Sequence, residues 1–300
     1  MAGTHLKVNP VNSEIPSFDI GLTGELNQDE DLQGYSVFTD SNTDDASLVR
    51  ADPVGASFLD VTTDPHAGPL QDFTFNDTIA SYRDNVHGDT VVTLENGESV
   101  VLQDSVSVDS NGRTLDSDIS IDGNTVAVEV DAPESADAYP LVTASGFVYL
   151  MDFDIGYTDP ATARTEMKAS GMFDTIFPVQ GAPEDFPEVG DLLPLYVAID
   201  IDLSSFECTF GGDAFISDGP YNEWGYWFDA TANHIDGEGS SIRFMMSGAP
   251  DEPDNTLAVY GDVMNNNPSG IPQSVYEIGA RSMWSEFARR LEWLTLFEQG

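Results

Sequence analysis

The imbalance of charge is the feature that most constrains this chain. It carries 53 Asp and Glu residues against 10 Lys and Arg residues, which gives a net charge of −43 over 300 residues. At ordinary ionic strength this much like charge opposes a compact state and favours disorder. Yet 40% of the residues are hydrophobic and 10% are aromatic, so the chain has enough apolar material for a core. The sequence therefore predicts a folded protein in a medium that screens the charge.

Concentrated salt provides such screening, because the Debye length falls to about 3 Å in molar salt. An acidic tail, a calcium-loaded protein or a mimic of DNA would also account for a large excess of acids. A tail would concentrate its acids in blocks, whereas here they are spread between apolar residues along the whole chain. We therefore favour adaptation to high salt, while calcium loading and mimicry stay open.

The same composition restricts partners and location. Nucleic-acid binding needs a basic stripe that neutralises phosphates, and the sequence has none. The single cysteine, Cys208, excludes an intrachain disulfide and a thiolate metal cluster. No window approaches the ~18 uninterrupted apolar residues of a spanning helix, and the first residues lack a signal-peptide pattern. We expect no nucleic-acid partner, no membrane span, and a protein that is cytoplasmic or leaves the cell without a leader, as a virion component does.

Three regions are expected, mainly β. Residues 1–72 are rich in turns and indicate an extended arm or small β layer that needs partners to bury its apolar residues. Residues 73–145 alternate β-branched and polar residues, with Asn and Gly turns between the runs. This pattern predicts an antiparallel sandwich or a jelly-roll-like module with five strands, at 91–94, 98–102, 105–108, 118–121 and 125–130.

Residues 146–300 form the third region and keep strong strand patterns. These lie at 147–151, 195–199, 241–246 and 256–260, with an aromatic strand starting at 224 and a short helix near 162–169. The last segment, 275–297, has apolar residues three or four apart behind a Ser274–Glu277 capping box, so it predicts an amphipathic helix. This helix either packs on the second β module or docks into a neighbouring subunit, with Trp284, Phe287, Trp293 and Phe297 as candidate assembly residues.

One loop combines a histidine with acids and glycines. His234, Asp236 and Glu238 lie close to an aromatic run that contains Trp224 and Trp227. One interpretation is a ligand-binding or catalytic loop at a pocket mouth, and the other is a turn with a surface histidine. No phosphate loop, nucleophile elbow, zinc helix or dinucleotide fingerprint is present in the sequence.

No cofactor is expected, although acidic turns such as 109–112 and 200–202 have oxygen ligands that suit Ca²⁺ or monovalent cations. None of these turns has the complete calcium-loop pattern that ends in Glu. Solvated, salt-adapted turns therefore explain them better.

Two stretches resemble known families. Residues 90–142, with Thr93-Leu94-Glu95-Asn96-Gly97-Glu98 and the closing Ala138-Tyr139-Pro140-Leu141-Val142, resemble a β module of extracellular prokaryotic proteins. Residues 227–295, around His234-x-x-Gly237-Glu238-Gly239 and the terminal helix, are similar to START-like ligand-binding folds, in which the last element is a long helix on a sheet. Neither resemblance implies catalytic residues.

As a class, the chain resembles structural proteins of haloarchaeal viruses, such as capsid, spike, turret or tail components. We therefore expect a non-enzymatic virion or extracellular surface protein that forms homo-oligomers and contacts other virion or surface proteins in high salt. Two alternatives remain: a binding module with an apolar pocket between the second sheet and helix 275–297 that involves Trp227, and a secreted hydrolase that uses His234 and nearby acids.

The charge predicts how folding depends on salt. In molar KCl the chain should melt cooperatively, and this transition should be lost on dialysis into dilute buffer without divalent ions, because the carboxylates then repel one another unscreened. Circular dichroism during heating measures this. A cooperative melt that survives in dilute buffer contradicts salt adaptation, and a melt restored by millimolar calcium alone supports the calcium-loaded alternative.

Overall fold

The protein is mainly β, as expected: in this computed structural model most of the described residues lie in strands, and far fewer lie in helices. The structure describes residues 4–8, 18–22, 26–28, 36–40, 45–52, 55–63, 71–75, 77–199, 202–234, 237–262 and 273–296.

The chain divides into two compact units, where the sequence predicted three regions. Unit 1 comprises Met1–Asp84 and Gly88–Tyr149, and unit 2 comprises Asn85–His87 and Leu150–Gly300. In the segment expected as an extended arm or small β layer, 1–72, the described strands β2 and β6 pair with later strands of unit 1, so these partners lie within the same chain. The other expected boundary, at 145, lies close to the observed one between Tyr149 and Leu150.

Unit 1 is an antiparallel sandwich. Its smaller sheet has the order β1–β2–β7–β13–β12, and its larger sheet has the order β3–β4–β5–β6–β14–β10–β9–β8, with β11 paired to β10. The strands of the smaller sheet are β1 (Thr4–Val8), β2 (Phe18–Leu22), β7 (Gln71–Phe75), β12 (Ser117–Asp122) and β13 (Thr125–Val130). Those of the larger sheet are β3 (Leu26–Gln28), β4 (Ser36–Asp40), β5 (Ala46–Asp52), β6 (Gly55–Thr62), β8 (Ile79–Asp84), β9 (Thr90–Leu94), β10 (Ser99–Val108), β11 (Thr114–Leu115) and β14 (Leu141–Tyr149), and a short 3-10 helix, η1 (Ala136–Ala138), precedes β14.

The core of the sandwich follows from the alternation along its strands. On β12, Ile119 and Ile121 pack against the core while Asp118 and Asp122 are exposed, since successive side chains of a strand point to opposite faces. Phe58 of the larger sheet meets Phe73 of the smaller one, with ring centroids 4.7 Å apart. The alternation of polar and apolar residues therefore places carboxylates in solvent and apolar side chains in the layer between the two sheets.

Two of the five predicted strands are in fact one. The runs 98–102 and 105–108 form the single strand β10, whose pairing with β14 shifts in register between Gln103 and Val106. Both halves pair with the same neighbour, so a bulge lies where two separate strands were expected. The expected turns at 95–97 and 122–124 are confirmed, with Gly97 and Gly123 at φ of +88° and +63°.

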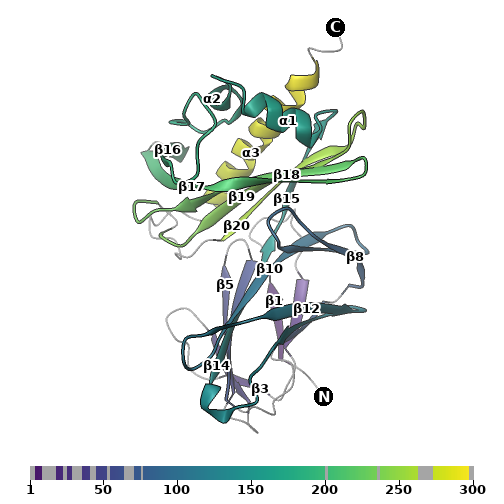
Figure 1. Ribbon diagram of the computed structural model, residues 1–300, viewed down its shortest axis with the longest axis vertical. Coiled ribbons are helices and arrows are strands. Elements are labelled where there is room, and N and C mark those ends of the chain that lie inside the picture. Colours follow the sequence, from purple (N-terminus) through teal and green to yellow (C-terminus); the bar gives the residue numbers. More distant parts are fainter. Residues whose placement is uncertain are drawn as a thin grey trace. The chain divides into compact units, whose positions relative to one another are not determined.

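Unit 2 is one antiparallel sheet with helices on one face (Figure 1). The sheet has the order β15–β20–β19–β18–β17–β16. Its strands are β15 (Met151–Gly156), β16 (Leu192–Ile199), β17 (Asp202–Asp218), β18 (Tyr221–Ala230), β19 (Ser241–Gly248) and β20 (Asn255–Asp262), and its helices are α1 (Pro160–Met167), α2 (Phe173–Ile176) and α3 (Gln273–Leu296). The predicted strand 147–151 is divided between β14 and β15.

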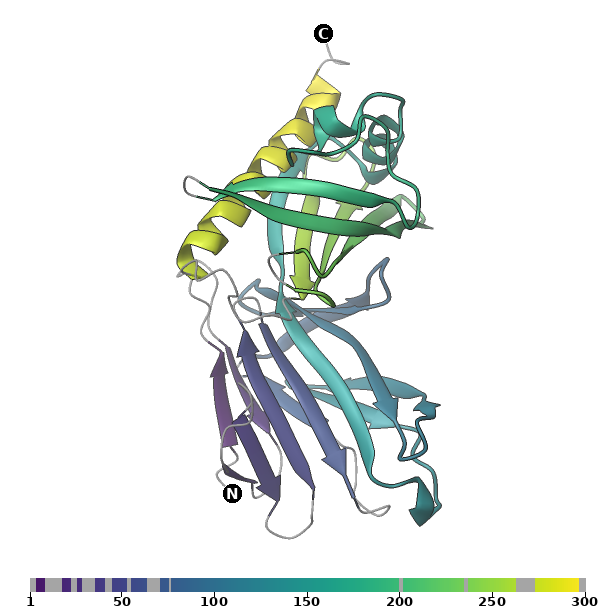
Figure 2. The ribbon, with the colours of Figure 1, turned by 90° about the vertical axis from the view of Figure 1, so that its left-hand side faces the viewer.

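The terminal helix packs on this sheet, which confirms the first of its two expected arrangements. Figure 2 shows α3 running across the sheet, and its residues Phe287 and Leu291 are fully buried in the core of unit 2. The apolar residues whose spacing predicted this helix thus form the face that covers the sheet. Among the helices that the structure describes, none combines the length and hydropathy that a membrane span requires.

Asp60 is a buried carboxyl group of unit 1. Ser47, Asp60, Thr143 and Ser107 stand opposite one another across four adjacent strands, β5, β6, β14 and β10. Ser47 donates a hydrogen bond to Asp60, and the hydroxyl groups of Ser107 and Thr143 lie 2.9 Å apart. Asp60 is 5% exposed. Burial raises its pKa from 3.8 to about 7, although the hydrogen bond from Ser47 opposes this shift.

This carboxyl group should make unit 1 sensitive to pH. The unfolded chain releases the Asp60 proton near pH 3.8 and the folded chain near pH 7, so stability is lost as pH rises between these values. Between pH 5 and pH 8, Asp60→Asn should remove a loss in unfolding free energy of about 3 kcal/mol at most. Denaturant unfolding in molar salt at pH 5 and pH 8, followed by circular dichroism, measures the difference. The control is Asp118→Asn, which changes an exposed residue on β12. The prediction is wrong if the unfolding free energy of Asp60→Asn changes with pH as much as that of the unmodified protein.

Candidate functional site

Helix α1 supplies the best-defined cluster of charged side chains in unit 2. Its first turn is capped by Asp159, whose carboxylate accepts hydrogen bonds from the amides of Ala161 (2.9 Å) and Thr162 (3.3 Å), and Pro160 occupies the first helical position. Ala163 and Met167 are buried and attach the helix to the core. Arg164 and Lys168 are four residues apart, so they project from one side of the helix.

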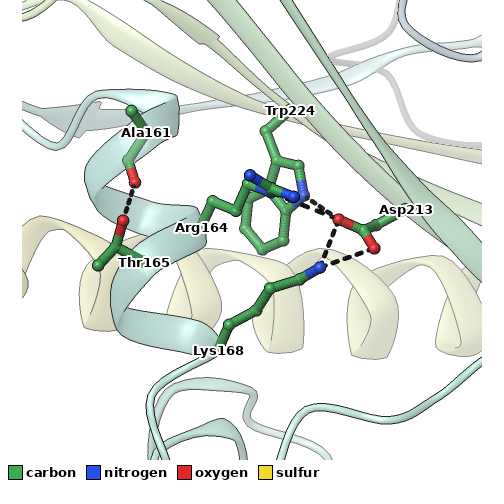
Figure 3. Close-up of polar contacts among 6 residues, drawn as sticks. All are labelled: Ala161, Arg164, Thr165, Lys168, Asp213 and Trp224. Carbon is green, nitrogen blue, oxygen red and sulfur yellow. Dashed lines mark hydrogen bonds and ion pairs between the residues drawn. The ribbon is translucent and has the colours of Figure 1, made fainter.

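These two cations meet one carboxylate on the sheet (Figure 3). Lys168 Nζ donates to both oxygens of Asp213 on β17, at 2.8 and 2.7 Å, and Arg164 Nε lies 3.5 Å from Asp213 Oδ2. The buried indole of Trp224, on β18, donates its Nε1–H to the same oxygen over 3.1 Å. Asp213 therefore joins α1, β17 and β18.

Aromatic rings surround this cluster. Lys168 Nζ lies 4.8 Å from the centre of the Phe186 ring, and the guanidinium carbon of Arg164 lies 5.5 Å from the centre of the Phe215 ring. Burial disfavours ionisation of Asp213, but the hydrogen bonds from Lys168 and Trp224 outweigh it and lower the pKa of this carboxyl group. Asp213 is held ionised and its oxygens are occupied, so the cluster acts as an anchor for α1 rather than as a general base.

The two tryptophans predicted beside the candidate loop do not share a face of the sheet. Trp224 is fully buried in the layer between the sheet and the helices. Trp227 is an odd number of residues away on the same strand, so it lies on the opposite face. There its ring meets His87 at 5.7 Å, and its indole fills the space that a side chain at Gly211 would need. Trp227 therefore does not line the space between the sheet and α3.

That space is filled by side chains. Phe177 contacts the rings of Phe244 (5.6 Å), Trp284 (6.2 Å) and Phe287 (5.5 Å), and all four rings are at most 5% exposed. Tyr226 stacks on Phe244 at 5.0 Å. This dense aromatic layer contrasts with the apolar pocket that the binding-module alternative requires.

His234 lies in a turn fastened to β17. The hydroxyl of Thr231 and the amide of Asn233 donate to Glu207 Oε1 at 2.7 and 2.8 Å, which lowers the pKa of that carboxyl group. The His234 ring is half-buried with its centre 4.9 Å from that of Phe206, and burial lowers its pKa from 6.5 to about 4. His234 is therefore neutral at neutral pH, as a base or metal ligand must be. Among the described ring contacts, its neighbour is Phe206 rather than Trp224 or Trp227.

The remaining predicted loop residues add little to a site. Glu238 is exposed, and Asp236 lies outside the described residues. Within the described ranges, no three His, Cys, Asp or Glu side chains are arranged to hold a metal ion. In the turn 109–112, a calcium candidate, Asp109 Oδ1 instead accepts the amides of Asn111 and Arg113, each at 2.9 Å. Residues 200 and 201 of the other named turn lie outside the described residues. Calcium or monovalent cations at the acidic turns, 109–112 included, stay a prediction.

The candidate assembly residues of α3 separate into two groups. Trp284 and Phe287 are buried in the core of unit 2, whereas Trp293 is 49% exposed. Phe297 lies outside the described residues. Arg289 lies over the Trp293 ring, with its guanidinium carbon 4.4 Å from the ring centre. The outward face of α3 thus carries an ordered Trp–Arg pair.

Sequence reasoning did not find Arg164, Lys168 and Asp213. A signal for the cations was present, because Lys168 is one of only two lysines and lies four residues after an arginine in a segment predicted as helical. No such signal existed for Asp213 among 53 acids, since only the fold places it beside α1.

Comparison of the chain with protein-family models, curated proteins and solved structures finds no match.

Removing the Asp213 carboxylate should destabilise the protein more than removing the charge of Lys168. Asp213→Ala leaves the buried Trp224 N–H without its acceptor, which should cost about 1–3 kcal/mol of unfolding free energy. Lys168→Met keeps the alkyl chain on Phe186 and removes only a half-exposed ion pair, so it should cost under about 1 kcal/mol. Denaturant unfolding in molar salt, followed by tryptophan fluorescence, measures both. Equal losses would contradict the assigned role of the Trp224–Asp213 hydrogen bond.

Proposed function

We propose that the protein is a non-enzymatic structural or surface protein that assembles in high salt, as a capsid, spike, turret or tail component of a halophilic virus or archaeon does. The observation that carries the proposal is how the chain distributes its charge. Carboxylates such as Asp118, Asp122 and Glu129 are exposed along the outer positions of strands, which suits a surface that stays hydrated in brine.

The arrangement of reactive groups also favours a structural role. Within the described residues, the side chains singled out from the sequence as a catalytic or ligand loop do not converge on one site. The carboxylates of Asp213, Asp109 and Glu207 are engaged as hydrogen-bond acceptors within the fold. In addition, aromatic rings occupy the space between the sheet and α3. These features support a fold whose polar groups serve its own stability.

Analytical ultracentrifugation in molar KCl tests this function. The chain should self-associate with rising concentration and should co-sediment with particles from the producing cells. Molar salt favours such association, because it screens charge and strengthens apolar contacts. A chain that remains monomeric at every concentration and never accompanies particles would argue against the proposal.

A further inference from the structure

The outward face of α3 differs from the rest of this acidic chain. Four exposed residues without an acidic group follow a helical spacing along it: Ser282, Ser285, Arg289 and Trp293. We call this set the α3 stripe. Glu292 is exposed as well, but its side chain lies beside Gly156 of β15. The last two residues of the stripe place a cation next to the largest apolar side chain.

The Trp–Arg end of the α3 stripe is held in place. Arg289 donates from Nε to Glu286 Oε2 (2.7 Å) and from a terminal nitrogen to Glu286 Oε1 (2.6 Å). Arg290 donates to the same carboxylate over 2.8 Å and also to the carbonyl of Thr175 over 3.0 Å. The hydrogen bonds from Arg289 and Arg290 lower the pKa of Glu286 to about 2. A side chain already fixed loses less entropy on binding, and tryptophan and arginine are frequent anchors of protein interfaces.

Charge limits what can cover this surface. Two copies of a chain with a net charge of −43 repel each other over most of their surfaces. Helix α3 carries three of the ten cations, Arg281, Arg289 and Arg290, against three glutamates. Its formal charge is therefore zero, and the repulsion against another copy is weaker along this helix than over the acidic chain as a whole.

We propose that the α3 stripe binds the same stripe of a second copy, with the two helices antiparallel across a two-fold axis. In that arrangement position 282 faces position 293, so Trp293 lies on the small Ser282 of the second copy. Position 286 faces position 289, so each Arg289 meets a Glu286 of the second copy. The contact is isologous, as in most homodimers. This inference rests on the proposed function, since it names the surface through which assembly starts.

Two substitutions test the contact by sedimentation velocity in molar KCl. Trp293→Ala removes the anchor and should weaken self-association at least about tenfold. Ser282→Gln should also weaken it severalfold, because a longer side chain obstructs the tryptophan; since Ser282 is exposed, this variant tests the contact without touching the core. The matched controls are Tyr221→Ala and Ser217→Gln, which alter exposed residues on β18 and β17 and should leave association unchanged.

The outcomes separate the two proposals. Assembly that is weakened by both α3 substitutions and by neither control supports the contact. If the unmodified protein self-associates and Trp293→Ala and Ser282→Gln do so equally well, this contact is wrong while the structural function stands. Loss of association in the controls to the same degree also overturns it. An unmodified chain that stays monomeric removes both proposals. Thermal melts in the same salt establish that each variant is folded.

Discussion

Repulsion among carboxylates is the constraint on which the rest of this structure depends. The chain has ten cations with which to offset it, and some of those that the structure describes join separate parts of the fold. Lys168 and Arg164 join α1 to β17 through Asp213. Arg290 joins α3 to the end of α2. With cations this scarce, such contacts fix elements to one another and leave most acids without a cation of the chain to offset them.

Two carboxyl groups show how the fold removes an acid from water. Asp213 stays ionised because two cations and an indole N–H face it. Asp60 has no described cation beside it, and burial shifts its pKa towards the neutral, protonated form. The first solution holds an element in place, whereas the second makes the stability of unit 1 depend on pH. Both follow from the cost of an unpaired charge in a medium of low dielectric constant.

The edges of the sheet in unit 2 are protected in ways that agree with a hydrated, acidic surface. The edge strand β15 exposes Asp152 and Asp154. The opposite edge strand, β16, contains Pro194, and the backbone amide of Tyr196 donates to the carbonyl of Gln180 over 2.8 Å. Charge, proline and a covering segment all discourage pairing between sheet edges of different copies. Association through a helix face is therefore more consistent with this unit than association through its strands.

The sequence by itself determined the periodic parts of this protein. Alternation and turn residues predicted most strands of 73–145, and spacing by three and four residues predicted α3, because such periods depend only on local backbone geometry. The tertiary structure decided what depends on distant partners. It joined two predicted runs into the single strand β10 and formed β17 from a segment whose Ser, Asp and Gly residues do not favour a strand. It also paired β6, from the region expected as an arm or small β layer, with β14 in the sandwich. It also placed Trp224 and Trp227 on opposite faces of the sheet and brought Asp213, one of 53 acids, next to Trp224. Pairing across a sheet brings together residues that are far apart in the chain, and the sequence contains no pattern that predicts such contacts.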